Sequence, residues 1–168
     1  MSTDAVIGYQ QVGGTSLWTA GEGDYSGGAL DLWANRVGAN QMWNRFQQKL
    51  DANPDTTSLW WELCTTDAGR GDNFEMGLAV LGEIEARLGG KTIYVSAQPD
   101  YDGHVCPTSG PDGPQQMQVL ASQLVATGRV LAGPFQGPLT ESQTRDLCHA
   151  SESGRLILGN QLLAFFGG

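Results

Sequence analysis

The sequence predicts an α/β domain built on an open parallel β-sheet with helices on both faces. Short apolar runs alternate with amphipathic stretches of helical length through the C-terminal two-thirds of the chain. Several of the 24 glycines stand in pairs between these segments, where turns and helix ends require them. A chain of 168 residues has the length of one domain, so we expect residues 1–168 to fold as a single unit.

The first apolar run of this alternation lies at residues 58–64 and is rich in aromatic side chains. It follows a turn marked by Pro54, and its composition predicts a buried strand. Apolar residues at helical spacing then predict a helix over residues 73–88, which Gly89 and Gly90 close.

The second half of the chain repeats this pattern. The elements expected there are a strand at residues 92–97, a helix at 114–126, a short strand at 129–132 and a final helix at 151–166. On the inner side of the final helix we expect Leu156, Gly159, Leu162, Leu163 and Phe166. Such an alternation implies parallel βαβ units, whose ligands bind beyond the carboxyl ends of the strands.

The N-terminal third does not follow the pattern. Thr3 is placed to cap a helix that runs through about residue 12 and ends at Gly13 and Gly14. The segments expected after it are at most a short strand at residues 16–18 and helices at 29–36 and 40–50. A doubly wound sheet normally begins on a strand, so we expect the first strand to be missing from this chain.

Charge and hydropathy exclude several classes of partner. The net charge is −9 and the nine basic residues are scattered, so we expect no nucleic-acid binding. No stretch of 18 apolar residues is present, which predicts no membrane span. The chain as given has no basic and apolar start of the signal-peptide type. Nothing in the composition indicates an oligomeric state.

We expect no metal site and no other cofactor. His104 lies near Asp100, Asp102 and Cys106, which are possible metal ligands, but no second cluster completes a coordination sphere. A polar loop is the favoured interpretation of this stretch. The glycine-rich segments do not spell a phosphate-binding motif after a strand.

Asp146 and His149 are the strongest candidates for catalysis. They lie three positions apart in the loop before the final helix. A neutral imidazole is a natural general base near pH 7, and it needs a carboxylate on its other nitrogen to fix the tautomer. An aspartate three residues earlier on a turn can supply that carboxylate. A purely structural hydrogen bond is the alternative interpretation.

The surrounding string, Asp146-Leu-Cys-His149-Ala-Ser151-Glu-Ser-Gly154, resembles the last conserved block of the SGNH (GDSL-like) hydrolases. The resemblance implies a three-layer flavodoxin-like sandwich and a Ser-His-Asp type site that acts on carboxylic esters, thioesters or acylated sugars. In that family a serine of the first block is the nucleophile. Its backbone amide forms the oxyanion hole with a glycine of the second block and an asparagine of the third. His149 would then be base and acid, and Asp146 would orient it.

The two middle blocks match the family less closely. After the strand at residues 58–64, Cys64 stands in the place of the family's glycine and Thr66 in that of its asparagine. The Thr66 hydroxyl could donate one hydrogen bond to an oxyanion, with a different reach from an amide. Gly28, at the entry to a helix, is the best candidate for the second-block glycine. An ordinary strand-end turn and a plain glycine-rich turn are the alternatives.

The nucleophile has three candidates. The letters around Ser16 resemble the GDSL motif, but Ser16 follows a helix and precedes a strand, the reverse of a nucleophile elbow. Ser2 stands just before the first helix, where the family nucleophile belongs, although no strand precedes it. The third candidate is a serine upstream of Met1.

The three cysteines leave one unpaired. Cys106 follows the strand at residues 92–97, and Cys148 lies between Asp146 and His149. Both loops belong on the same rim of the sheet, so we expect a Cys106–Cys148 disulfide that clamps the candidate catalytic loop. Cys64 would be left for a partner on the missing strand. The alternative is three reduced cysteines in a cytosolic protein.

We therefore expect an exported bacterial esterase that acts on a small-molecule ester or an acylated carbohydrate. One alternative is the same fold without a working nucleophile, serving as a carbohydrate-binding or structural module. The other is an unrelated flavodoxin-like binding domain, in which Asp146 and His149 form a structural pair.

Overall fold

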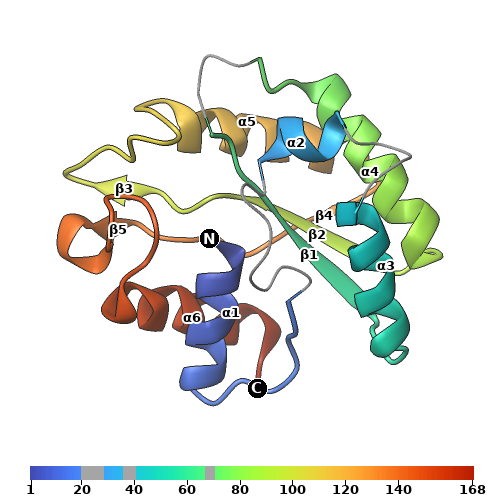
Figure 1. Cartoon of the computed structure of the whole chain (residues 1–168), viewed down its shortest axis with the longest axis horizontal. Coiled ribbons are helices and arrows are strands. Elements are labelled where there is room, and N and C mark those ends of the chain that lie inside the picture. Colours follow the sequence, from blue (N-terminus) through green and yellow to red (C-terminus); the bar gives the residue numbers. More distant parts are fainter. Residues whose placement is uncertain (20–28, 36–40, 67–70) are drawn as a thin grey trace.

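A computed structural model of the chain describes residues 1–19, 29–35, 41–66 and 71–168 (Figure 1). At its centre is a three-stranded parallel sheet in the order β1-β2-β4. The strands are β1 (Ser58–Leu63), β2 (Thr92–Ala97) and β4 (Leu131–Ala132). The predicted α/β class and the parallel pairing are confirmed, because all three strands fall within predicted segments.

The sheet's register places β1 and β2 side by side over their full length, beginning with Ser58 opposite Thr92. Successive side chains of a strand point to opposite faces. Accordingly, Trp61 packs into the apolar core on one face of the sheet and Trp60 into the core on the other. Both faces of β1 are therefore covered, which explains why its sequence is apolar without a clean alternation.

Six α-helices are present in the described part of the chain. They are α1 (Ser2–Gln11), α2 (Leu30–Ala34), α3 (Gln41–Ala52), α4 (Phe74–Leu88), α5 (Gly113–Ala126) and α6 (Glu152–Phe166). Asn73 caps α4 by accepting a hydrogen bond from the backbone N–H of Met76 at 3.0 Å. Ser151 caps α6 in the same way through Gly154. The helices from α4 onward begin within one residue of the predicted positions.

One expectation for the N-terminal third is wrong. Thr3 does not cap α1, because the helix begins at Ser2 and places Thr3 inside its first turn. At residues 16–18, where at most a short strand was expected, no strand forms, and Ser16 contacts the hydroxyl of Tyr9. Helix α2 lies within the expected segment 29–36, and α3 ends at Ala52, two residues beyond the expected end; residues 36 and 40 are outside the described part.

A second, two-stranded parallel sheet pairs β3 (Tyr101–Asp102) with β5 (Leu139–Thr140). A short 3₁₀ helix, η1 (Glu141–Gln143), follows β5. These pieces are too short to produce a hydrophobic period, and the sequence analysis did not predict them. They join the loop after β2 to the loop before α6, and these two loops carry the cysteines and the Asp146–His149 pair.

The helices lie in two layers on opposite faces of the sheet (Figure 1). Helices α1 and α6 cover one face, and α2, α4 and α5 cover the other. Each layer has its own buried cluster. The first includes Tyr9, Leu139, Leu158 and Leu162, and the second includes Leu81, Val95, Leu120 and Leu124.

Glycines allow α1 and α6 to cross in direct backbone contact. A Cβ added at Gly159 would lie 2.1 Å from the backbone of Gly8, and one added at Gly8 would lie 1.8 Å from the carbonyl oxygen of Arg155. Gly159 therefore faces inward, as predicted. The prediction for Leu156 is wrong, because this side chain is 40% exposed and Leu158 is buried against α1 in its place.

Candidate active site

Asp146 binds His149 through both of its carboxylate oxygens. Oδ2 accepts a hydrogen bond from the ring Nδ1 of His149 at 2.7 Å, while Oδ1 accepts from the backbone N–H groups of His149 at 2.6 Å and Cys148 at 3.1 Å. Partial burial raises the pKa of Asp146, but these hydrogen bonds outweigh burial and hold the pKa below its ordinary value. With Nδ1 engaged, Nε2 of His149 is left to accept a proton, as a general base requires.

The loop that carries this pair is closed on itself. The backbone N–H of Arg145 donates to the carbonyl of His149 at 2.9 Å. The guanidinium of Arg145 donates to the carbonyl of Ala150 at 3.1 Å. Between them Leu147 adopts a left-handed backbone with φ of 64°. This turn brings the N–H groups of Cys148 and His149 onto the Asp146 carboxylate.

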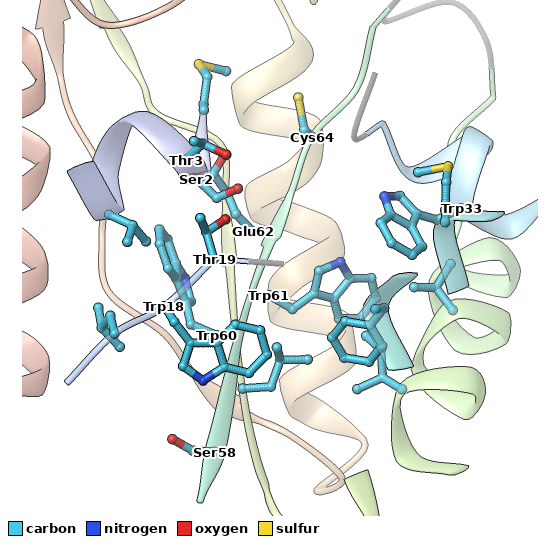
Figure 2. Close-up of a pocket in the computed structure, with 18 of the residues that line it drawn as sticks. Ser2, Thr3, Trp18, Thr19, Trp33, Ser58, Trp60, Trp61, Glu62 and Cys64 are labelled. Atoms are coloured by element: carbon cyan, nitrogen blue, oxygen red, sulfur yellow. The ribbon is translucent and has the colours of Figure 1, made fainter. Parts of the chain in front are cut away.

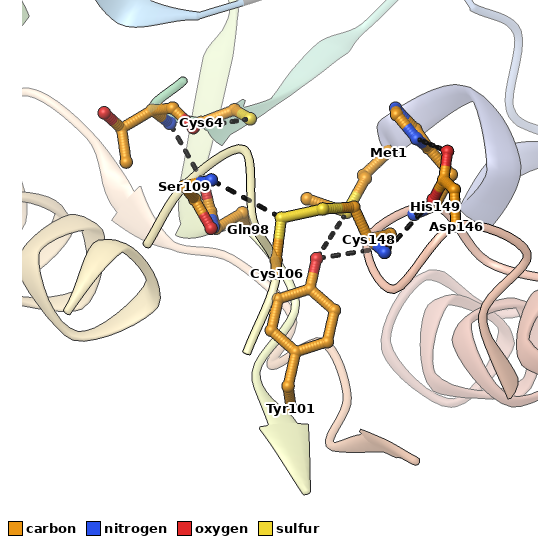
Figure 3. Close-up of a disulfide and its surroundings, with 10 residues drawn as sticks. Met1, Cys64, Gln98, Tyr101, Cys106, Ser109, Asp146, Cys148 and His149 are labelled. Atoms are coloured by element: carbon orange, nitrogen blue, oxygen red, sulfur yellow. Dashed lines mark hydrogen bonds and ion pairs between the residues drawn. A yellow bond between two sulfur atoms is a disulfide. The ribbon is translucent and has the colours of Figure 1, made fainter. Parts of the chain in front are cut away.

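A disulfide anchors the same loop to the loop after β2 (Figure 3). Cys106 and Cys148 are bonded with an S–S distance of 2.07 Å, and both residues are buried. The hydroxyl of Tyr101 donates to the carbonyl of Cys148 at 3.0 Å and so supports the loop from below the disulfide. Burial raises the pKa of Tyr101, which keeps this hydroxyl a donor. The predicted pairing is confirmed.

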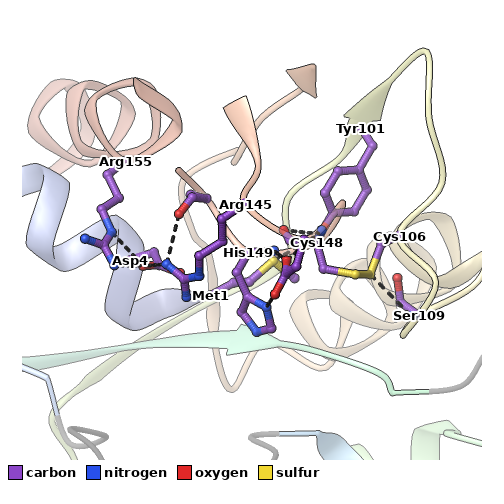
Figure 4. Close-up of polar contacts among 11 residues, drawn as sticks. Met1, Asp4, Tyr101, Cys106, Ser109, Arg145, Cys148, His149 and Arg155 are labelled. Carbon is purple, nitrogen blue, oxygen red and sulfur yellow. Dashed lines mark hydrogen bonds and ion pairs between the residues drawn. A yellow bond between two sulfur atoms is a disulfide. The ribbon is translucent and has the colours of Figure 1, made fainter. Parts of the chain in front are cut away.

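Asp4 ties α1 to the candidate catalytic loop and to α6 (Figure 4). Its side chain is 6% exposed and accepts from the guanidinium of Arg145 at 3.1 Å and from that of Arg155 at 2.7 Å. Two arginines compensate the cost of burying one carboxylate. The amino end of α1, which carries Ser2, is therefore fixed relative to the loop that carries His149.

A cavity of about 840 Å³, the β1 cavity, extends along β1 (Figure 2). At the carboxyl end of the strand its lining is polar, and Ser2, Glu62, Cys64, Thr66 and His149 contribute to it. Along the middle of the strand its lining is mainly aromatic and aliphatic, and residues 52–58 line it at the amino end. The cavity thus brings together His149, Ser2 and Thr66, three of the residues that the sequence analysis assigned to a site.

Ser2 is the first residue of α1, and its backbone N–H acts on the carboxyl group of Glu62 by lowering its pKa. Burial raises the pKa of Glu62 to about 7, against the opposing effects of the chain's amino group and of the Ser2 N–H. The Glu62 Oε2 atom is shielded from water and has no hydrogen-bond partner among the described residues, although other atoms of the side chain line the cavity. In the described part of the chain, no hydrogen bond joins the Ser2 hydroxyl to His149.

The other predicted site residues have different outcomes. Ser16 lines the cavity, but its hydroxyl lies 2.6 Å from the hydroxyl of Tyr9, so it serves the packing of α1. Thr66 lines the cavity and is partly exposed, as an oxyanion donor would need to be. Its neighbour Thr65 is buried, and the Thr65 N–H donates a hydrogen bond to Gln98 Oε1 at 3.0 Å. Gly28 lies outside the described residues.

Sequence reasoning missed three residues that build this site, namely Asp4, Glu62 and Tyr101. A carboxylate such as Glu62 inside an apolar strand of the sequence Ser-Leu-Trp-Trp-Glu-Leu was an available signal, because an isolated acid rarely enters a buried strand without a role. Asp4 and Tyr101 carried no comparable signal. Their partners lie 141 and 47 residues away in the sequence.

The described residues contain no group of three or more His, Cys, Asp or Glu side chains that could hold a metal ion. His104 belongs to a loop in which its Nδ1 lies 3.3 Å from the carbonyl of Asp102 and its ring packs edge-on against Tyr101. In the same described ranges, no helix combines the length and the hydropathy needed to cross a bilayer.

Comparisons of the chain with protein-family models, with curated proteins and with solved structures found no significant match.

Proposed function

We propose that this chain hydrolyses carboxylic esters, with Ser2 as the nucleophile, His149 as the general base and then acid, and Asp146 as its orienting carboxylate. The observation that carries the proposal is the 2.7 Å hydrogen bond between Asp146 and His149 on the wall of a cavity that Ser2 also lines. A small-molecule ester or an acylated carbohydrate would bind at the polar end of the β1 cavity. The resemblance of the residues around Asp146 to the last SGNH block supports the same reaction class.

The reaction would proceed in two halves. The Ser2 hydroxyl attacks the ester carbonyl carbon and its proton passes to Nε2 of His149, which then returns the proton to the departing alcohol. A water molecule, deprotonated by the same nitrogen, attacks the acyl-serine, and the acid leaves as the proton returns to Ser2. Asp146 stabilises the imidazolium formed in each half, because its carboxylate already holds Nδ1.

The oxyanion requires donors that this site supplies only in part. The Ser2 N–H, one expected donor, interacts with the Glu62 carboxyl group, while the Thr66 side chain lines the cavity. The following N–H groups of the first turn of α1 belong to a helix start, which favours negative charge.

The engaged Ser2 amide favours a second candidate function, that of a relative of the same fold that binds an acylated carbohydrate without hydrolysing it. Such a protein would keep the Asp146–His149 pair as a structural brace of its loop. The two functions differ in turnover, so a hydrolysis assay separates them.

Hydrolysis of p-nitrophenyl acetate and butyrate tests the proposal. The wild-type chain is expected to release p-nitrophenol above the buffer rate, and His149→Ala is expected to lose that activity. His104→Ala is the matched control, because it removes the other histidine of the chain without touching the cavity wall. Activity that survives in His149→Ala would remove His149 from the mechanism, and a wild-type rate equal to the buffer rate would favour the binding function.

A compartment outside the cytoplasm fits this proposal. The Cys106–Cys148 disulfide clamps the loop that carries His149, and such bonds persist in oxidising surroundings.

A further inference from the structure

The free edge of β1 forms one wall of the β1 cavity. Five consecutive residues of the strand, from Ser58 through Glu62, line the cavity, although successive side chains point to opposite faces of the sheet. Only the edge of a strand is common to both faces, so the cavity follows the backbone edge of β1. Among the described residues β1 pairs with β2 alone, and no described strand pairs with its other edge.

The cavity opens into both apolar layers at once. Val6 and Phe166 reach it from the apolar cluster on the α1/α6 side of the sheet, while Phe46 of α3 and Ile84 of α4 reach it from the cluster on the other side. In Figure 2, Trp18 and Trp60 lie on one side of β1 and Trp33 and Trp61 on the other. A groove on the protein surface would contact one layer. A gap that lies beside a strand edge and opens into both apolar layers has the shape that one further strand would fill.

Another wall is formed by residues 17–19, which belong to no helix or strand. The indole N–H of Trp18 donates to Thr56 at 3.1 Å, which fixes this wall to the turn before β1. The two walls are thus held apart at a defined place, with the cavity between them. Met1 and Ser2 close the cavity at the carboxyl end of β1, where Ser2 meets Glu62.

We propose that this gap receives an extended, mostly apolar polypeptide segment of about six residues, added as a further strand parallel to β1 with its carboxyl end beside Met1. The length follows from the six residues of β1, and the direction from the wholly parallel pairing of the sheet. Side chains of the segment would enter the two apolar layers alternately, and its backbone would satisfy the free edge.

The charges of the lining favour a neutral peptide over a fatty acid. No lysine or arginine is among the described residues that line the cavity, whereas Asp55 and Glu62 are. A fatty carboxylate would therefore face two acids, and the amino group at Met1, the cation on the described lining, already interacts with Glu62. The backbone of a peptide offers both hydrogen-bond donors and acceptors and carries no net charge. It can therefore pair with the N–H and C=O groups along the edge of β1. This inference does not rest on the proposed ester hydrolysis, although both concern the same cavity.

Two extended forms of the full chain test the proposal. In one, six residues alternating valine and isoleucine are joined directly ahead of Met1. In the matched control, the second and fourth of these residues are proline, which lacks the N–H that a ladder requires. A third form with threonine at alternate positions keeps the strand preference with less apolar surface, so that aggregation of the first form leaves a second test.

The apolar extension is expected to raise the unfolding midpoint by about 5 °C or more. It is also expected to slow amide hydrogen exchange at least tenfold in the peptide covering residues 58–63, and the proline form is expected to do neither. An equal effect of the apolar and proline extensions, or no effect of either apolar form, would overturn the proposal. Stoichiometric binding of a fatty acid that the apolar extension does not displace would also overturn it.

Discussion

Asp146 accepts hydrogen bonds from two different N–H groups of His149, the backbone N–H at 2.6 Å and the ring Nδ1 at 2.7 Å. A carboxylate that holds both the main chain and the ring of one residue fixes the orientation of that ring. Because the pair is about half exposed, the contact adds little to global stability, and its consequence is the position and tautomer of His149.

Asp146→Asn is expected to lower kcat/KM for p-nitrophenyl esters on the order of 10³-fold or more. An amide nitrogen facing Nδ1 cannot accept its proton, so the ring loses the tautomer that leaves Nε2 free. Steady-state kinetics measure the loss, and Asp102→Asn is the control at an exposed aspartate. An unchanged rate for Asp146→Asn would show that the pair has only a structural role.

Glu62→Gln is expected to flatten the dependence of stability on pH. The pKa of Glu62 is about 7 in the folded chain against an ordinary value of 4.5, so the folded state binds a proton that the unfolded state has released. The stability from this group is full below pH 4.5 and is lost as the pH rises through 7. Glutamine cannot ionise, so the variant should avoid a loss of up to roughly 3 kcal/mol.

Urea unfolding at pH 5 and pH 8 measures this difference. Glu75→Gln, at an exposed position of α4, should change the two free energies of unfolding equally. If Glu62→Gln and wild type lost the same stability between the two pH values, the Glu62 carboxyl would not be buried as described.

Cys148→Ser is expected to lower the free energy of unfolding by about 4 kcal/mol, the chain-entropy value for a bridge between residues 42 positions apart. It should also reduce esterase activity, because the bridge holds the loop of Asp146 and His149. Cys64→Ser is the control, since Cys64 is the free cysteine of the chain. In thermal unfolding, a reductant should lower the midpoint of wild type toward that of Cys148→Ser. It should leave the midpoint of Cys148→Ser unchanged.

Gly159→Ala is expected to destabilise the fold by about 3 kcal/mol, because the new methyl group would meet the backbone of Gly8 at 2.1 Å and force α1 and α6 apart. Gly82→Ala, on α4, is the matched control. A Cβ there meets nothing within 4 Å, so the change should stabilise the chain by up to about 1 kcal/mol through helix propensity. Equal effects of the two substitutions would contradict the close crossing of α1 and α6.

The sequence predicted those elements whose formation depends on residues close together in the chain. The apolar run of β1 and the glycine end of α4 at Gly89 could be predicted because their evidence lies within a few neighbouring positions. The Asp146–His149 contact and the Cys106–Cys148 bridge also followed from short spacings and from the rule that loops at one edge of a parallel sheet meet. Both are present in the structure.

What the sequence could not supply were contacts between distant positions. The cluster of buried Asp4 with Arg145 and Arg155 joins the two ends of the chain, and nothing near Asp4 indicates its partners. Thr3 does not act as a cap because the helix already begins at Ser2, and α1 packs on α6 through the distant pair Gly8 and Gly159. The position of Ser2 above Glu62 likewise depends on where α1 lies on the sheet.

The nucleophile is the most direct test of the proposed reaction. A fluorophosphonate probe is incubated with the folded wild-type chain and with His149→Ala, and the labelled peptide is identified by mass spectrometry. The account predicts stoichiometric label on Ser2 in the wild type and at least a hundredfold slower labelling in His149→Ala. A folded wild-type chain that takes no label, or takes it on Ser16, would contradict the account.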